Sequence, residues 1–264
     1  MNKKSIKIQF VIPAYGDSPY IEECIKTLLS QALADQISIA TSTPSTFLDQ
    51  LAFKYGLKIN VNPHKNGIAN DWNFALKQKD AKFDLIVIAH QDDLYETQFS
   101  KRVTSFFRAH SDVGIVFTDC AELIQGKTHF NSKREIVKKL LRRLAFFGAA
   151  TVNTKMRYRF LLGFGCSIPC PTVIFNSSRL VGFEFSGQYS VNLDWAAWLS
   201  IAKRGVKIGY IPSSLVVHRI HDSAETQNAI VDQRRSNEDL LIFEGLWPKS
   251  FAKLLMMIYQ FGYK

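Results

Sequence analysis

The sequence predicts an α/β fold with a mostly parallel central sheet and helices on both of its faces. Short apolar β-like runs alternate with amphipathic helical patterns through the first half of the chain. One run, residues 82–90, is apolar on both faces, as expected of a central parallel strand covered by helices. With 264 residues, 47% of them hydrophobic, the chain is long enough to form one large domain around a substantial core.

The first half reads as strand and helix in turn. A strand at residues 6–14 precedes a helix at 18–33, for which Ser18 is the expected N-cap, Pro19 the first helical residue and Glu22 the capping-box partner. The elements that follow are strands at residues 36–43, 57–62, 82–90 and 113–123, and helices at 44–56 (ended by Gly56), 66–79 and 96–110.

The second half keeps both element types without strict alternation. The expected elements are an amphipathic helix at 134–147, a strand at 171–178, a helix at 191–205 ended by Gly205, a strand or strand pair at 206–221 broken at Pro212, and a polar helix from about 224 to 240.

The net charge of +10 is concentrated in one segment. Nine basic residues and one acidic residue between Asn131 and Phe160 carry +8, so the rest of the chain is almost neutral. Such a segment indicates one anionic surface or ligand, and the chain has no nucleic-acid-binding motif. We therefore expect no nucleic acid partner.

Other features indicate a cytoplasmic protein. No apolar run approaches the roughly 18–20 residues that span a bilayer. Lys7 and Gln9 interrupt the apolar region that a signal peptide would need, so we expect no leader. The four cysteines form no CxxC pair and lie in mostly apolar contexts, which is typical of a reducing compartment.

Two adjacent carboxylates, Asp92 and Asp93, follow the apolar strand at 82–90. Neighbouring like charges cost free energy unless a cation, a proton or hydrogen bonds compensate them. Ligands of parallel sheets bind beyond the carboxyl ends of the strands, where PAYG, TSTPS and HQDD should converge. Capping a following helix would need only one aspartate. The pair therefore favours a divalent cation held together with a phosphate-bearing ligand.

Five segments resemble the inverting glycosyltransferases of family 2, which have the GT-A fold. They are FVIPAYGDSPYIEECIKTLLSQ, GIANDWNFAL, IAHQDDLY, LDWAAWL and HRIHDSAET, within about residues 6–226. The resemblance implies a metal-dependent enzyme that moves a sugar from a nucleotide diphosphate to a hydroxyl of a glycan or lipid-linked glycan in cell-surface polysaccharide synthesis. It also implies two halves of one continuous domain, with residues 1–130 binding the nucleotide sugar in a Rossmann-like half and residues 131–264 forming a helical, basic, acceptor-binding half.

The resemblance also implies the donor and metal residues. The family's aspartate motif falls on residues 90–93, so that Gln91 and Asp92 would contact the donor, and Asp92 and Asp93 would hold Mn²⁺ or Mg²⁺ together with the late histidine, His221. The other expected nucleotide contacts are Pro13, Ala14, Tyr15, Thr41, Ser42, Asp71 and Asn73. For Asp71 and Asn73 the alternative is an exposed helix face.

The chain departs from the family pattern at two places. His90 stands where the family has the first aspartate, and ATSTPS lacks the aspartate that reads the base. Hydroxyl groups select a base less sharply than a carboxylate, so the expected donor is a UDP-sugar, a dTDP-sugar or another. The departures also leave an alternative, a non-catalytic protein of the same fold that binds nucleotide sugars or glycans.

By the same resemblance, Asp194 is the catalytic base, and its alternative role is helix N-capping. One carboxylate suffices for an inverting displacement, because it only has to take a proton from the acceptor hydroxyl. Trp195 has two candidate roles, stacking on an acceptor sugar and packing in the core. His218 lies on the opposite strand face from His221, and we expect it to be structural.

The basic helix at 134–147 has two interpretations. Its apolar residues are Ile136, Val137, Leu140, Leu141 and Leu144, and its basic residues on the other side are Lys138, Lys139, Arg142 and Arg143. Either the leucines pack on the sheet, or the helix lies at an anionic membrane surface with Phe146 and Phe147 at the acyl boundary. The tail from residue 246 would then be its partner, Arg157 and Arg159 would contact lipid phosphates, and the protein would be peripheral at the inner face of the cell membrane.

Overall fold

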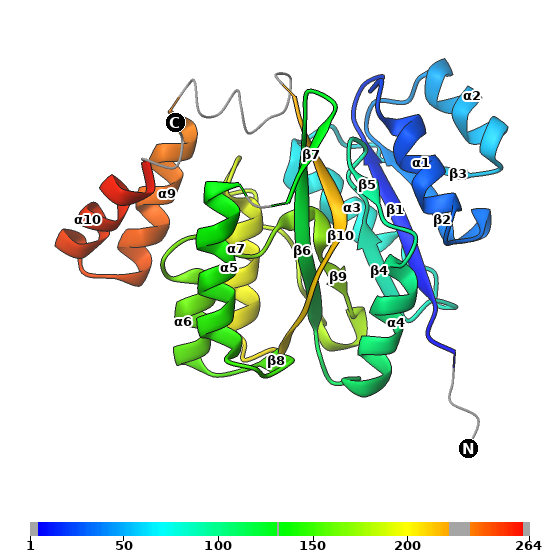
Figure 1. The fold of residues 1–264 in the computed structure, drawn as a ribbon. Helices are drawn as coiled ribbons and strands as arrows, with labels where there is room; N and C mark the ends of the chain where they lie inside the picture. The colour runs from blue at the N-terminus through cyan, green and yellow to red at the C-terminus, as the bar shows by residue number, and fades with distance from the viewer. Residues whose placement is uncertain (1–4, 131, 222–232, 261–264) are drawn as a thin grey trace.

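The computed structural model describes residues 5–130, 132–221 and 233–260 and shows a sheet flanked by helices (Figure 1). Within these residues the strands follow the order β3-β2-β1-β4-β9-β6-β10-β5, with β7 beside β6 and β8 beside β10. The strands are β1 (Ile8–Ala14), β2 (Ile37–Thr41), β3 (Lys58–Val61), β4 (Leu85–Ile88), β5 (Leu94–Tyr95), β6 (Ile115–Ile124), β7 (Lys127–His129), β8 (Thr151–Val152), β9 (Ile174–Phe175) and β10 (Ile208–Ile220).

The longer strands run in one direction. Strand β1 is parallel to β2 and β4, β2 to β3, and β6 to β10. The short β9 is antiparallel to both β4 and β6, which makes those two parallel to each other. The predicted mostly parallel α/β sheet is therefore confirmed, and the carboxyl ends of β1, β2, β4, β6 and β10 lie along one edge.

Helices cover both faces of this sheet. They are α1 (Ile21–Leu29), α2 (Thr46–Tyr55), α3 (Ile68–Lys77), α4 (Phe99–Ala109), α5 (Lys133–Phe146), α6 (Lys155–Leu162), α7 (Leu193–Lys203), α9 (Arg234–Leu246) and α10 (Lys249–Gln260), with short 3₁₀ turns at Ala34–Gln36, Cys170–Thr172 and Ser177–Arg179. In β1, Phe10 and Ile12 join the core cluster of α1, α2 and α4, whereas Val11 joins that of α3, α5, α6, α7 and α9. Such strands are apolar on both faces because both faces are covered.

Some predicted element boundaries are wrong. Helix α1 begins at Ile21, after Tyr20, because the Ser18 hydroxyl accepts the Tyr20 N–H in a local turn and does not cap the helix. Strand β10 passes through Pro212 unbroken, since irregular pairing with β6 between Ile211 and Val216 absorbs the proline. The predicted helix at 224–240 falls partly on 222–232, outside the described residues, and α9 begins at Arg234.

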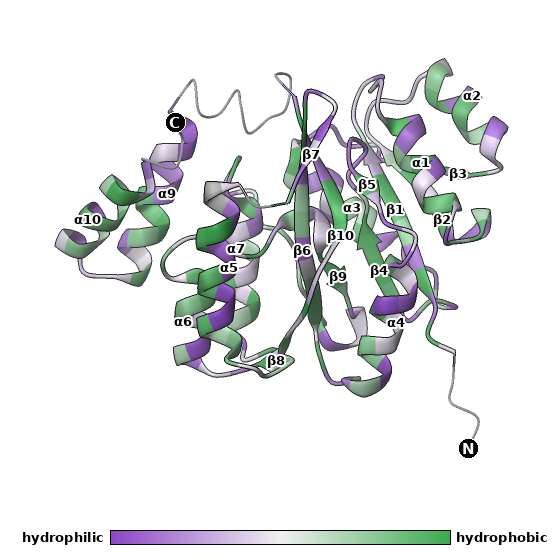
Figure 2. Cartoon of the chain, in the orientation of Figure 1, coloured by the Kyte–Doolittle hydropathy of each residue, from purple (hydrophilic) through white to green (hydrophobic). Residues whose placement is uncertain are grey.

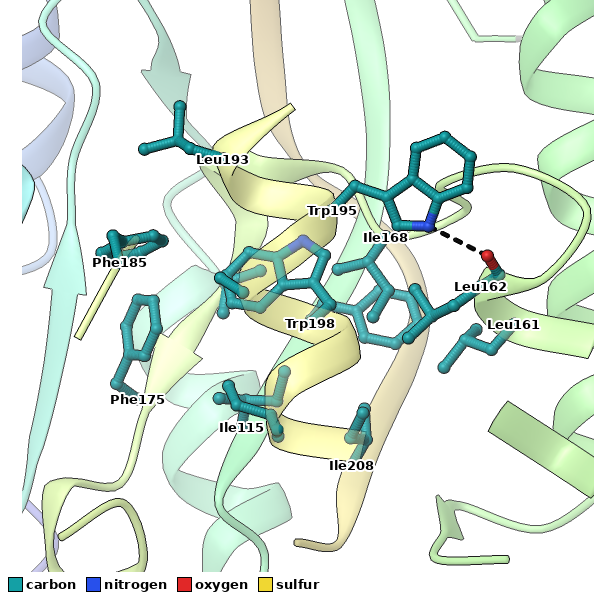
Figure 3. Packing of buried hydrophobic residues seen from close by; sticks show 14 of the residues in the cluster. Ile115, Leu161, Leu162, Ile168, Phe175, Phe185, Leu193, Trp195, Trp198 and Ile208 are labelled. Carbon is teal, nitrogen blue, oxygen red and sulfur yellow. Dashed lines mark hydrogen bonds between the residues drawn. The ribbon is translucent and has the colours of Figure 1, made fainter. Parts of the chain in front are cut away.

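Helix α7 is anchored by two tryptophans in the core. Figure 3 shows Trp195 and Trp198 projecting from α7 among buried apolar side chains. Trp195 has no exposed surface, and its indole N–H donates to the Leu162 carbonyl at 2.9 Å. The expectation that Trp195 contacts an acceptor is therefore wrong, because the ring lies inside the protein.

Helix α5 packs against the protein with the side that carries Glu135, Arg142 and Phe146. Leu140 and Leu144 are 56% and 46% exposed, whereas the Arg142 side chain is fully buried. Phe146 packs against the rings of Phe117 and Tyr210. Of the two interpretations of this helix, the one in which its leucines pack on the sheet is therefore wrong. In the other interpretation, the placement of Phe146 at a membrane boundary is wrong.

Buried charges explain this orientation. The Arg142 guanidinium forms ion pairs with Glu135 and with Asp119 of β6, the latter at 3.0 Å, and donates to the Ser167 carbonyl at 2.7 Å. The Tyr210 hydroxyl donates to Asp119 at 2.7 Å. A guanidinium withdrawn from water needs such partners, so the ion pairs fix which side of α5 is inside.

Among the described helices, each is too short or too polar to cross a bilayer.

Replacing Arg142 with alanine should lower the free energy of unfolding by about 3–5 kcal/mol, because Glu135 and Asp119 would stay buried without their cation. The matched control is Arg143→Ala, which removes an exposed cation from the same helix and should change stability by less than about 0.5 kcal/mol. Urea denaturation of the three proteins measures both effects. Equal losses in the two variants would contradict the structural role of Arg142.

Candidate active site

The loop between β4 and β5 lies at the carboxyl edge of the sheet. Strand β4 ends at Ile88, and residues 89–93 lead into β5, where Leu94 and Tyr95 pair with Val217 and Val216 of β10. This pairing brings the two aspartates of the loop beside the end of β10, which carries His218 and Arg219 and leads into His221.

Asp93 is fully buried in this loop. One carboxylate oxygen lies 2.8 Å from His218 Nδ1 and accepts the Arg219 backbone N–H at 2.9 Å. The other lies 3.7 Å from His90 Nδ1. Burial raises the pKa of Asp93, but the charges of His218 and His90 and the Arg219 N–H outweigh burial and hold the pKa below its usual value. Burial lowers the pKa of His218, but the charge of Asp93 and its hydrogen bond outweigh burial and raise the pKa to about 9.

This position differs from the one expected for Asp93. A carboxylate with no exposed surface, held by His218 and Arg219, has no surface at which to contact a cation bound outside the core. The expectation that Asp93 binds the metal directly is therefore wrong in this structure. Asp93 instead compensates the positive charge of His218, which agrees with the structural role expected for that histidine.

Asp92 is the partly exposed aspartate of this loop. Its side chain is partly exposed, and one carboxylate oxygen lies 2.9 Å from His221 Nε2. The Arg219 guanidinium connects the loop to α1. Its Nε donates to the Asp92 carbonyl at 3.1 Å, and its Nη2 donates to Glu23 of α1 at 2.5 Å. Sequence reasoning missed Arg219, although it lies between the two histidines of HRIH.

Asp92 and His221 are the residues here that suit a divalent cation. A carboxylate oxygen and an imidazole nitrogen can both ligate Mn²⁺, and a cation shared with a diphosphate needs few protein ligands. In the described part of the chain, no group of three or more His, Cys, Asp and Glu is arranged to hold a metal by itself. The donor set therefore fits a metal whose remaining ligands are phosphate oxygens and water.

The loops after β1 and β2 are held by side chains predicted to touch a nucleotide. The Gln91 amide accepts the Tyr15 N–H at 3.2 Å and donates to the Tyr15 carbonyl at 3.3 Å, so it is already used by main chain. Thr41 is buried, and its hydroxyl accepts the Thr43 N–H at 3.0 Å. Of the expected loop contacts, Tyr15 is the exposed one, whereas Pro13 is half-buried and Ala14 is buried.

Asp71 of α3 places a carboxylate beside the β2 loop. It accepts the Ser42 hydroxyl at 3.0 Å and the Asn62 side-chain amide at 2.9 Å. Asn73 lies two residues later on the same helix and takes no part in this cluster. Its amide bonds the Phe185 carbonyl at 2.9 Å and the Phe185 N–H at 2.7 Å. The expected nucleotide contact of Asn73 is therefore wrong, since both polar ends of the side chain already bind main chain.

Asp194 lies in the first turn of α7, and the N-cap position belongs to Asn192, so Asp194 is not the N-cap residue. One carboxylate oxygen accepts the Trp195 N–H at 2.7 Å. Burial raises the pKa of Asp194, although Arg235 and His90 act in the opposite direction. The ring of His90 lies 3.7 Å from Asp93 at one nitrogen and 3.8 Å from Cys170 Sγ at the other. His90 therefore links Asp194 electrostatically to the aspartate loop.

Helix α9 holds the start of α7. The Glu238 carboxylate accepts three backbone N–H groups, those of Ser190, Val191 and Asn192, at 2.8, 3.0 and 2.8 Å. Asp239 accepts the Asn192 side-chain amide at 2.7 Å. Sequence reasoning missed both acids, because a polar helix does not by itself show which loop it contacts.

The two arginines expected at a lipid phosphate lie on α6. Arg157 donates to the Phe146 carbonyl at 3.1 Å, and the Arg159 guanidinium lies 4.3 Å from the centre of the Trp247 ring. These contacts attach α6 to its neighbours and leave the expected lipid contact as a prediction.

The pH dependence of stability should show the burial of Asp239. Burial raises its folded pKa to about 6, above an unfolded value of about 3.9. The protonated Asp239 therefore contributes fully to the free energy of unfolding below about pH 4, and this contribution is lost as pH rises to about 6. The wild-type free energy of unfolding, measured with urea between pH 4 and 7, should fall by about 2–3 kcal/mol from this group, and Asp239→Asn should not show that fall. Parallel profiles for variant and wild type would contradict the raised pKa.

Two solved structures with this architecture hold a nucleotide sugar. Residues 1–349 of TarS from S. aureus, in complex with UDP-GlcNAc, superpose with a TM-score of 0.61 at 14% identity, covering 95% of this chain and 70% of that one. The mannosyltransferase PcManGT from Pyrobaculum calidifontis, in complex with GDP-Man and Mn²⁺, superposes with a TM-score of 0.61 at 16% identity, covering 96% and 68%. At such identities the likeness shows the fold.

Sequence comparison adds the family. No curated protein sequence matches the chain closely enough to count as a relative. The model of the family described as "Glycosyltransferase like family 2" matches residues 6–237. Because that match covers most of the chain and the solved structures share its architecture, the chain belongs to glycosyltransferase-like family 2 and has the GT-A fold.

Proposed function

We propose that the protein is an inverting glycosyltransferase whose catalytic base is Asp194. The observation that carries the proposal is the placement of Asp194, a partly exposed carboxylate of raised pKa, within electrostatic reach of the loop that bears Asp92. A base close to a carboxylate that can hold a metal diphosphate is what a displacement at a sugar carbon requires.

In this mechanism Asp194 takes the proton from an acceptor hydroxyl as the hydroxyl oxygen attacks the anomeric carbon. The bond from that carbon to the nucleotide diphosphate breaks on the opposite face, which inverts the configuration. A raised pKa makes Asp194 a stronger base than an exposed aspartate. Glu238 and Asp239 keep the start of α7, and with it Asp194, in position.

Asp92 and His221 are the proposed residues at the diphosphate. Mn²⁺ or Mg²⁺, when bound there, would neutralise charge on the leaving group. Asp93 positions His218 and Arg219 through its carboxylate, and Arg219 in turn holds the Asp92 main chain.

The proposed donor is a UDP-sugar or a dTDP-sugar. The carboxylate of Asp71, held by Ser42 and Asn62, can accept the N3–H that uracil and thymine share. The proposed acceptor is a hydroxyl of a glycan or lipid-linked glycan in cell-surface polysaccharide synthesis, at an anionic membrane surface inside the cell. The charge of +8 between Asn131 and Phe160 supports the anionic surface.

One observation favours a second candidate, a binding protein without turnover. His90 stands in place of the family's first aspartate, so the motif has one carboxylate fewer. The His90 ring packs instead against Trp72, with 5.1 Å between the ring centres. The two candidates differ in whether nucleoside diphosphate is released.

Asp194→Asn should lower kcat for release of nucleoside diphosphate by about 10²–10⁴-fold, because it removes the base. The donor should still bind, since Asp194 does not touch the diphosphate in this mechanism. The measurement uses a panel of nucleotide sugars with Mn²⁺ and an acceptor extract, and Asp49→Asn on an exposed part of α2 is the control. Wild type that binds a donor and releases nothing would favour the binding protein.

Asp92→Asn should remove the Mn²⁺-dependent part of nucleotide binding. Thermal shifts with UDP and dTDP, each with and without Mn²⁺, measure it, since a ligand that binds only the folded state raises Tm. His110→Gln, at the far end of α4, changes a histidine away from the crevice and should behave as wild type. A metal-dependent shift that survives in Asp92→Asn would contradict the assignment.

A further inference from the structure

The exposed side of α5 is an apolar surface. Ile136, Val137, Leu140, Leu144 and Phe147 recur at the spacing of one helix face, and each is between 46% and 84% exposed. We call these five residues the α5 stripe. Green segments along α5 in Figure 2 mark its hydrophobic residues. A soluble monomer rarely gathers so many large apolar side chains on one exposed face without a function.

The helix cannot turn this stripe inward. Its opposite side carries Arg142, which is fully buried and forms ion pairs with Glu135 and Asp119. Rotation would break these buried pairs and remove Phe146 from its contacts with Phe117 and Tyr210. The orientation with the stripe outward is therefore built into the core of the protein.

The charges around the stripe are positive. Arg143 is exposed beside it, Lys139 lies one turn earlier on the same flank, and Lys155 follows on α6. Glu135, the one acidic residue between Asn131 and Phe160, is buried against Arg142. The charged residues of this segment that flank the stripe are thus cations.

We propose that the α5 stripe docks on an anionic bilayer, with its apolar side chains at the boundary of headgroups and acyl chains and its flanking cations on lipid phosphates. An apolar helix face bordered by Lys and Arg has the chemistry of an interfacial helix. A second copy of the chain fits less well, because a two-fold interface would set this cationic surface against itself.

Strand pairing places one end of α5 at the active-site edge. His218 of β10 pairs with Glu122 of β6, which pairs with His129 of β7, and α5 begins after Ser132. A bilayer that contacts α5 would therefore lie close to the loops that carry Asp92 and His221. The inference rests on one part of the proposed function, the anionic membrane surface, to which it assigns the residues, and it does not depend on sugar transfer.

Co-sedimentation with vesicles tests the docking. Wild type should bind vesicles of phosphatidylcholine with about 30% phosphatidylserine, should not bind phosphatidylcholine alone, and should lose binding between about 0.1 M and 0.5 M salt. Leu140→Gln with Leu144→Gln should weaken binding about tenfold or more, because two inserted side chains become polar. Leu33→Gln with Phe53→Gln, which changes two exposed apolar residues outside α5, should bind as wild type.

Each further outcome decides the question. Lys139→Gln with Arg143→Gln should weaken binding to the anionic vesicles and flatten its salt dependence, since both cations flank the stripe. Absence of vesicle binding by wild type, or equal binding by wild type and the Leu140/Leu144 variant, would overturn the proposal. So would a wild-type dimer in sedimentation velocity that the Leu140/Leu144 variant abolishes, because the stripe would then bind a second copy. No donor or acceptor is present, so the result leaves the role of Asp194 untouched.

Discussion

The architecture of the site depends on one buried carboxylate, that of Asp93. A charge with no exposed surface must find its partners inside the protein. Its partners are the His218 ring and the Arg219 N–H, which lie 125 and 126 residues later in the chain. Arg219 then reaches the Asp92 carbonyl and Glu23 of α1. The need to compensate one charge thus joins the loop after β4, the end of β10 and the first helix.

This arrangement explains how two neighbouring aspartates coexist. Their electrostatic environments differ, since Asp93 is paired with a histidine whose pKa is raised to about 9, whereas Asp92 is partly exposed beside His221. The positive charge held against Asp93 reduces the cost of placing a second carboxylate next to it. One aspartate therefore serves the fold, and the other is left available to a ligand.

The sequence was sufficient for the fold class and for the edge at which the site lies. Strand and helix periodicity, together with the two-sided apolar strand at 82–90, depends on local pattern and on the general geometry of parallel sheets. The roles of Gln91 and Asn73 could not be predicted from the sequence, because their hydrogen-bond partners are backbone groups 76 and 112 residues away. The direction of α5 was left open between two interpretations for another reason. A pattern of charged and apolar residues predicts the apolar side inward, and here the ion pairs of Arg142 reverse it.

The contacts of Glu238 have a consequence for the order in which the protein matures. The main-chain groups it holds belong to residues 46–48 positions earlier. A chain emerging from the ribosome can form β1 to β4 and the hydroxyl-rich loops while α9 is still unmade. The start of α7 receives its support only when α9 arrives. The nascent protein therefore completes the loops around Asp92 before α9 supports the start of α7, which carries Asp194, the proposed base.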